Sequence, residues 1–264
     1  MAIAIQNLAW GIGQPIFGAL AERFGDRKAI IVGALLQHYP WQTVFVIFAG
    51  AILCVLLRAF KDPTYLMITL GFFSCGYQLS FITAHFPAFI TQRSGAIDAG
   101  GMLADFGITP TSILGAISIS VIGLFNVGGS IMAGWLGKFH AKKYLLAAIY
   151  VGRTVAAAVF IMLPMTPATV LVFSAVMGSM WLATVPLTSG LVAHIYGLRY
   201  MGTLYGFVFL SHQIGSFLGV WLGGRMYDLT GDYTAVWWVG VGVGAFSALI
   251  HLPIREKVLV PQTA

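Results

Sequence analysis

Long apolar segments run through the chain, separated by short loops that are polar or carry glycine and proline. A helix that crosses a hydrocarbon core about 30 Å thick needs about 20 predominantly apolar residues. By this measure the sequence predicts membrane-spanning helices at roughly residues 2–20, 64–90, 112–137, 144–163, 167–192, 200–224 and 234–254. The pattern therefore predicts an all-α membrane protein, a polytopic helix bundle.

Residues 29–57 are also apolar, but a polar and aromatic run around Pro40 interrupts them. Proline removes a backbone donor and should break a helix there. Lys28 and Arg58 flank the segment, so it should cross the membrane an even number of times, yet it is too short for two full spans. We expect either a re-entrant or distorted segment, or a chain that has lost helices here relative to a longer ancestor.

The composition supports the membrane assignment. Of 264 residues, 59% are hydrophobic and only 8% are charged, and the mean hydropathy is +0.89. Soluble domains carry about a quarter charged residues, so a soluble fold of this length would expose large apolar patches. The 32 glycines suit close approach of membrane helices. The partner implied is a lipid bilayer, and the net charge of +6 indicates orientation rather than nucleic-acid binding.

The distribution of positive charge predicts the topology. Alternate loops hold eleven of the fourteen basic residues and the opposite loops hold only two, next to four aspartates. Lysine and arginine are enriched in cytoplasmic loops. The sequence therefore predicts a multi-pass protein of the plasma (inner) membrane with its C-terminus in the cytoplasm. The eleven residues are Arg23, Arg27, Lys28, Arg58, Lys61, Lys138, Lys142, Lys143, Arg199, Arg255 and Lys257.

Several classes of chemistry have no motif in the sequence. Cys54 and Cys75 both lie in apolar stretches and are expected to be buried thiols rather than a disulfide or metal pair. The chain shows no Walker loop, no H-E-x-x-H and no histidine pair at i, i+4 within a span, so we expect no ATP-driven step, no enzyme, no cofactor and no metal. A basic region before the first apolar run is also missing, so no cleavable signal peptide is expected.

The loop at residues 18–28 resembles the signature loop of the major facilitator superfamily, G-x-x-x-[DE]-[RK]-x-G-x-[RK]-[RK]. In that family the loop joins the second and third helices on the cytoplasmic side, where the charge pattern places it independently. The resemblance implies that Glu22 helps to close the cytoplasmic side against the helix that starts near Gly202. The alternative is that these charges only set the topology. The matching positions are Gly18, Glu22, Arg23, Gly25, Arg27 and Lys28.

The same family resemblance divides the chain. Residues 64–254 look like a complete C-terminal six-helix half, although Lys138 stands where the echo of the signature loop usually has an acid. Residues 1–57 look like a partial N-terminal bundle that lacks the first, fourth and fifth helices and most of the third. Residues 58–63 would be a cytoplasmic linker and 255–264 a cytoplasmic tail. Within the superfamily, residues 75–78, 184–189 and 211–217 are similar to bacterial monocarboxylate porters and oxalate:formate antiporter-like proteins.

Polar groups deep in a bilayer are costly, so each is a candidate for the transport path. His212 and Gln213 should lie about 18–20 Å into a span of about 30 Å, and the histidine can titrate near neutral pH. Arg153 suits carboxylate recognition, although the resemblance puts it on a peripheral helix. Structural alternatives remain open: a hydrogen-bonded neutral histidine, an arginine paired with a loop or carbonyl, and amides that join helices. The further candidates are Gln78, Thr83, His85 and Asn126.

The glycines at 215, 219 and 223 form a row at four-residue spacing, which predicts a face for close helix packing.

We therefore expect a secondary active transporter that works by alternating access around a central site. The resemblance, with His212 and Arg153, indicates a small organic anion such as a mono- or dicarboxylate, carried by antiport or proton symport. The alternative is a truncated or internally deleted homologue without transport activity of its own. An intramembrane enzyme has no motif support.

Overall fold

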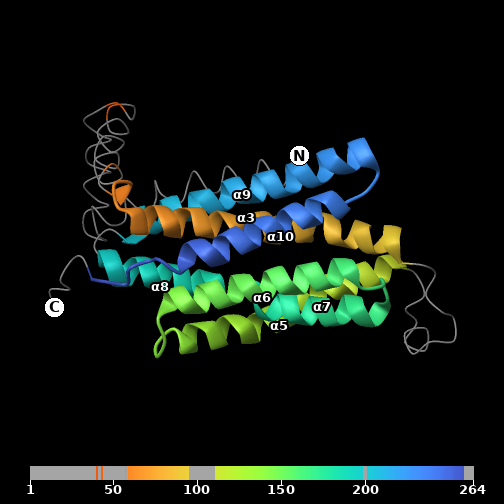
Figure 1. Cartoon of the computed structure of the whole chain (residues 1–264), viewed down its shortest axis with the longest axis horizontal. Coiled ribbons are helices and arrows are strands. Elements are labelled where there is room, and N and C mark those ends of the chain that lie inside the picture. Colours follow the sequence, from red (N-terminus) through yellow and green to blue (C-terminus); the bar gives the residue numbers. More distant parts are fainter. Residues whose placement is uncertain are drawn as a thin grey trace.

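The computed structural model describes residues 59–94, 111–198 and 201–258, together with the isolated positions Pro40, Thr43 and Leu57. These residues contain helices and no strand. The helices are α3 (Pro63–Arg93), α5 (Thr111–Leu136), α6 (Lys142–Met162), α7 (Pro167–Ser179), α8 (Thr184–Tyr196), α9 (Met201–Thr230) and α10 (Thr234–His251) (Figure 1).

Six stretches of the described chain are long and apolar enough to cross a membrane, with α7 and α8 counted as one stretch, Pro167–Tyr196. This confirms the expected all-α membrane bundle and the six spans between residues 64 and 254. The structure adds a break, because the predicted span 167–192 is two shorter helices. The expected span 2–20 and the interrupted segment 29–57 lie outside the described residues, apart from the isolated positions above.

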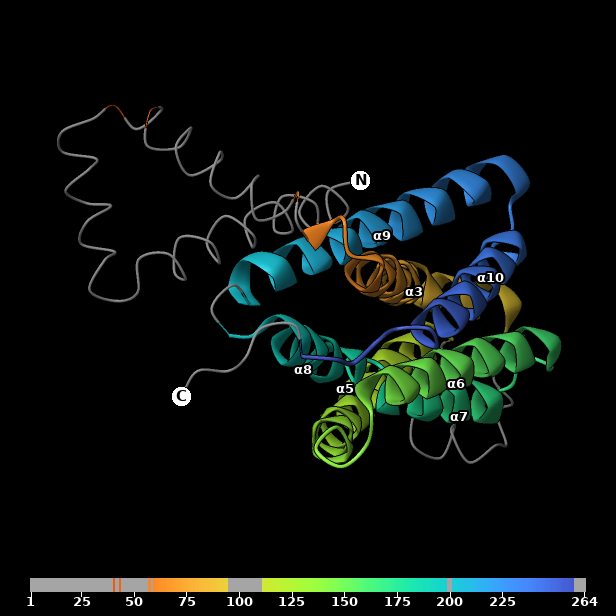
Figure 2. The ribbon, with the colours of Figure 1, turned by 60° about the vertical axis from the view of Figure 1, so that its left-hand side comes forward.

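The helices form two layers (Figures 1 and 2). One layer contains α3, α9 and α10, with α3 packed most extensively against α9. The other contains α5, α6, α7 and α8, with α5 packed against α7. Helix α10 joins the layers because it packs on both α3 and α6.

Local sequence explains where the helices begin and end. The Asp62 side chain accepts a hydrogen bond from the Thr64 N–H (2.9 Å) at the start of α3, as a helix N-cap does. Thr166 caps α7 in a reciprocal capping box. Gly197 ends α8 with φ of 77° and Gly231 turns the chain between α9 and α10 with φ of 70°, a region that favours glycine.

The backbones of α3 and α9 approach closely through glycine. A Cβ atom at Gly215 would collide with the carbonyl oxygen of Phe73, and one at Gly219 with that of Tyr77. From the other side, Gly76 faces the His212 carbonyl in the same way. The predicted glycine face is therefore confirmed as a packing surface.

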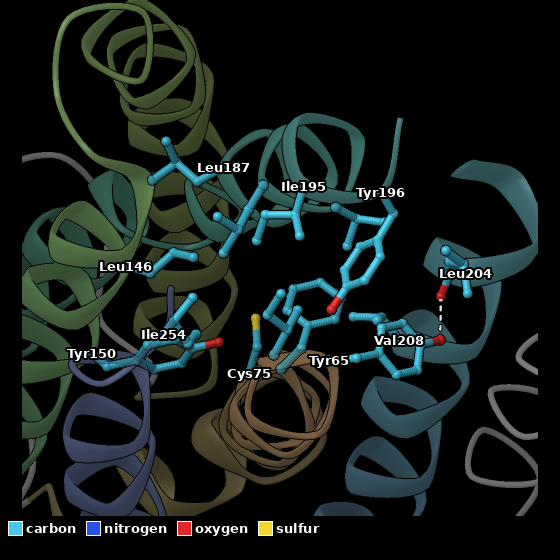
Figure 3. Close-up of a cluster of buried hydrophobic side chains, with 14 of the residues drawn as sticks. Tyr65, Cys75, Leu146, Tyr150, Leu187, Ile195, Tyr196, Leu204, Val208 and Ile254 are labelled. Atoms are coloured by element: carbon cyan, nitrogen blue, oxygen red, sulfur yellow. Dashed lines mark hydrogen bonds between the residues drawn. The ribbon is translucent and has the colours of Figure 1, made fainter. Parts of the chain in front are cut away.

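Buried apolar side chains gather into two clusters. The first surrounds Cys75 and Tyr65, whose hydroxyl donates to the Leu204 carbonyl at 2.8 Å (Figure 3). The second is rich in aromatic rings, including Phe160 and Trp237. Arg153 of α6 and Thr184 of α8 both contact Cys75, which belongs to the first cluster.

Candidate solute-binding site

Arg153 lies inside the bundle and not on its periphery. Its side chain, on α6, is fully buried, with 0% exposure. Nη1 donates to the Cys75 sulfur at 3.4 Å, and the guanidinium carbon lies 5.7 Å from the centroid of the Tyr150 ring. Within the described chain, Nε and Nη2 have no hydrogen-bond partner. Among the described residues the arginine has no loop or carbonyl partner, the alternative left open by the sequence, and two of its donors are unpaired.

Cys75 connects this arginine to the break between α7 and α8. Its sulfur lies 3.2 Å from the hydroxyl oxygen of Thr184, the first residue of α8. The His212 carbonyl of α9 packs against Gly76, the next residue of α3. Figure 3 shows the thiol pointing from α3 into the space between the helices, with the Tyr150 hydroxyl directed toward it. The sulfur is thus the meeting point of polar side chains from α6 and α8.

His212 is held by its neighbours but keeps one ring nitrogen free. Nδ1 lies 3.1 Å from Oε1 of Gln213, and an amide oxygen only accepts, so Nδ1 donates. The ring packs between Phe72 and Phe209, at centroid distances of 4.9 and 5.4 Å. Among the described residues Nε2 has no hydrogen-bond partner.

Gln78 and His85 are occupied by bonds between helices. Nε2 of Gln78 donates to the Gly240 carbonyl at 2.9 Å, which joins α3 to α10. Nε2 of His85 lies 2.9 Å from the Val220 carbonyl, which joins α3 to α9. Both contacts fit the structural alternative stated for these candidates.

Asn126 and Thr83 also bond away from the arginine. The Asn126 side-chain oxygen accepts from the backbone N–H of Leu182 at 2.9 Å, in the break between α7 and α8. Thr83 is exposed and donates to the Leu79 carbonyl of its own helix at 2.8 Å. Of the seven candidates, Arg153 hydrogen-bonds to Cys75, while His212, bonded to the adjacent Gln213, packs against the residue of α3 that follows Cys75.

Two members of this cluster were not singled out from the sequence. Cys75 was expected to be a plain buried thiol, and Thr184 was not proposed for a role. Both residues lie in stretches that resemble carboxylate porters, residues 75–78 and 184–189. That resemblance is the sequence feature that could have pointed to them. The six signature-loop residues Gly18, Glu22, Arg23, Gly25, Arg27 and Lys28 lie outside the described residues.

An exposed ion pair lies at the other end of α3. Arg93 Nη2 is 3.1 Å from Oδ2 of Asp232, and both side chains are nearly half exposed. Burial acts to raise the pKa of Asp232, but hydrogen bonds from Thr234 and Arg93 and the Arg93 charge outweigh it, so the pKa is lowered from its ordinary value. The pair ties the α3 end to the α9–α10 turn and is distant in sequence from the cluster at Arg153.

A groove of about 690 Å³ lies between α5, α6 and the α7–α8 break. Apolar side chains such as Leu124, Phe125 and Met132 line it, and these three are exposed on α5. A lipid-facing surface of a membrane bundle has this character. The groove therefore offers no polar recognition comparable to the Arg153 cluster.

The fold of the bundle is similar to part of a solved transporter. Its helices superimpose on the crystal structure of the E. coli fucose:proton symporter FucP with a TM-score of 0.56 and 16% sequence identity. The match covers 76% of this chain and 45% of that one. No protein-family model matches the chain.

Two curated relatives extend this result to the sequence. An uncharacterized MFS-type transporter of Bacillus subtilis (strain 168), YcxA, is 24% identical over 268 positions, covering 88% of this chain and 62% of the relative. Monocarboxylate transporter 12-B of Danio rerio is 28% identical over 259 positions, covering 80% and 54%. The chain is thus similar in sequence to two proteins named as transporters, one of them of the MFS type. It spans 62% and 54% of the length of these two relatives, both of which are transporters by name.

Proposed function

We propose that the chain acts as a secondary active transporter of a small organic anion, such as a mono- or dicarboxylate, by antiport or proton symport. The observation that carries the proposal is Arg153, a fully buried cation with two unpartnered nitrogens. A guanidinium offers two parallel donors that match a carboxylate. An ionised side chain buried inside a membrane bundle is costly and marks a candidate functional site.

The surroundings of Arg153 support an anionic cargo. The Thr184 hydroxyl lies 3.2 Å from the same sulfur that Arg153 contacts. The cluster lies beside the N-terminus of α8 at a helix break. Broken helices whose N-termini point at anionic groups are a recurring feature of transporter sites. The name of the Danio rerio relative, a monocarboxylate transporter, agrees with this substrate class.

Alternating access requires two bundles and a gate. In this proposal residues 64–254 are the C-terminal half, 1–57 a partial N-terminal bundle, 58–63 the cytoplasmic linker and 255–264 a cytoplasmic tail. Glu22 and Arg23 of the signature loop would close the cytoplasmic side against the start of α9. The support is the motif itself and the positive charge of the loops on that side.

Uptake into proteoliposomes tests the proposal. Purified protein would be offered labelled L-lactate, labelled oxalate and, as a neutral solute, labelled fucose, with and without an inward proton gradient. We expect flux of at least one of the two anions and none of fucose. Arg153→Gln should abolish the anion flux, whereas Arg225→Gln, which removes an exposed arginine of α9, should retain it. Transport of fucose alone would refute the anion assignment.

The second candidate is a homologue without transport activity of its own. The observation that favours it is the span of only 62% and 54% of the relatives' length. It predicts that the purified chain is folded and monodisperse in detergent but moves neither anion. Anion flux above that of protein-free vesicles would exclude this candidate.

A further inference from the structure

The charge of Arg153 needs compensation that no carboxylate of the described chain provides. Arginine stays protonated in proteins, and a buried charge is tolerated only when it is paired. The acids in the described residues are engaged or exposed elsewhere. Asp62 accepts from the Tyr196 hydroxyl, Asp232 pairs with Arg93, Glu256 accepts from the Lys143 N–H, and Asp228 is exposed.

The Cys75 sulfur stands where the missing counter-charge should be. It is fully buried and accepts the single hydrogen bond that Arg153 donates within the described residues. The Thr184 hydroxyl lies 3.2 Å away and can donate to it as well. A neutral thiol is a weak acceptor, whereas a charged donor such as Arg153 bonds more strongly to an anionic acceptor. The two polar contacts of this sulfur, with Arg153 and Thr184, would suit a thiolate.

From this geometry we propose that Cys75 is the proton-coupling group of the transporter. Its thiolate neutralises Arg153 when the site is empty, and it is protonated when the carboxylate of the cargo replaces it on Arg153. The inference rests on the proposed function, because it assigns the proton step to that same site.

The charges balance through this step. In the empty state the guanidinium carries one positive charge and the thiolate one negative charge. In the loaded state the carboxylate supplies the negative charge, and one proton from solution has formed the S–H bond of Cys75. No electron moves, and the cluster is neutral in both states. One proton therefore accompanies each monocarboxylate, which makes transport electroneutral.

Several other titratable side chains lie near the cluster. His212 of α9 is buried, and its Nε2 has no hydrogen-bond partner among the described residues. The other titratable groups that face the cluster are Tyr150 of α6, Tyr205 of α9 and His251 of α10. His251 is fully buried and donates through Nδ1 to the Ser247 carbonyl at 2.7 Å.

The test compares wild type with Cys75→Ser, which keeps a small polar side chain but cannot ionise near neutral pH. Cys54→Ser controls for the loss of a cysteine, and Cys75→Asp restores an ionisable group. Two readouts of labelled lactate are needed: accumulation driven by a proton gradient, and exchange without any gradient. A third readout is the thiolate absorbance of the detergent-solubilised protein at neutral pH with and without lactate.

We expect Cys75→Ser to lose about 5-fold to 150-fold of the gradient-driven accumulation, the usual size of a coupling free energy, while exchange persists. Cys54→Ser should behave as wild type, and Cys75→Asp should recover part of the coupling. Wild type should show a thiolate absorbance that Cys75→Ser lacks and that lactate removes.

Two results would overturn the inference. One is full gradient-driven accumulation in Cys75→Ser, which would leave the proposed transport intact and move the coupling to another residue. The other is the absence of thiolate absorbance in the wild type, which needs no transport activity to detect. Failure of every anion to move in wild type would instead refute the proposed function.

Discussion

Replacing Arg153 with methionine separates a functional from a structural role for this residue. Methionine is unbranched and fills a similar space without charge. If Arg153 holds the bundle together, its loss should destabilise the protein. If it is kept for a ligand, its loss should cost transport and leave stability unharmed or improved.

The contacts give the expected size of each effect. The variant loses one hydrogen bond to sulfur, at 3.4 Å, and a ring contact at 5.7 Å, together worth about 1–3 kcal/mol. It also relieves the desolvation of a buried ion, several kcal/mol, and lets Cys75 become neutral. Replacement of a buried ion pair by apolar groups is commonly neutral or stabilising by about 1–4 kcal/mol. Losing the partner of a carboxylate costs about 2–5 kcal/mol of affinity, which is about 30-fold or more.

Thermal unfolding in detergent and lactate uptake into proteoliposomes measure the two effects on the same preparation. We expect an unchanged or higher Tm and uptake reduced by about 30-fold or more. Arg153→Lys keeps the charge but not the planar fork, so it should resemble wild type in Tm and still transport poorly. A Tm that falls by more than about 5 °C in Arg153→Met, more than 1 kcal/mol at this chain length, with uptake preserved, would refute the reasoning.

Four further perturbations follow from the contacts. Asn126→Ala removes the acceptor of a backbone N–H and should lower stability by about 1–3 kcal/mol; an unchanged thermal transition would contradict this. Gly215→Ala places a methyl group against a backbone carbonyl and should lower the free energy of unfolding by about 1–3 kcal/mol. Gly123→Ala, where a Cβ would meet nothing within 4 Å, should be neutral or slightly stabilising. Equal effects of the two substitutions would contradict the close packing at Gly215. Asp232→Asn should lower stability slightly at neutral pH, by under about 1 kcal/mol because the pair is exposed. Because the pKa of Asp232 is lowered, the ion pair stabilises the protein above about pH 4, the ordinary aspartate value, and this stabilisation is lost at lower pH. The melting curves of wild type and Asp232→Asn should therefore converge in acid, and also at high salt. Glu22→Gln should impair uptake without preventing membrane insertion, and unchanged kinetics would show that the signature loop only sets the topology.

The spans were predictable because the bilayer fixes their length. For α9, the predicted start at residue 200 and the observed start at Met201 differ by one residue. The break within Pro167–Tyr196 was missed, although Pro186 carried a signal for it. A proline ring collides with the carbonyl four residues earlier, here Leu182, which lies in the break. The apolar pattern continues through the break, so hydropathy alone does not reveal it.

The placement of Arg153 was harder to predict. A helix that is apolar on every side has no polar face to mark which residues turn inward. The buried residues of α6 nevertheless include Leu146, Tyr150, Arg153, Ala157 and Phe160, spaced at three and four residues along one face. The two aromatic residues in this row show that Arg153 shares the face that carries large core side chains. The contact with Cys75 depends on the relative placement of α6 and α3, which a single sequence does not reveal.

The break between α7 and α8 explains how an event at Arg153 can reach the rest of the bundle. Backbone groups freed at a break in a membrane must find partners, and the Leu182 N–H finds one in Asn126 of α5. The other contact is the hydroxyl of Thr184 on the Cys75 sulfur, so α8 begins at the atom that Arg153 also binds. By contrast, α3 and α9 meet backbone to backbone at Gly215 and cannot slide without collision. We therefore expect a change in the charge of the sulfur to shift α8 relative to a rigid α3–α9 pair.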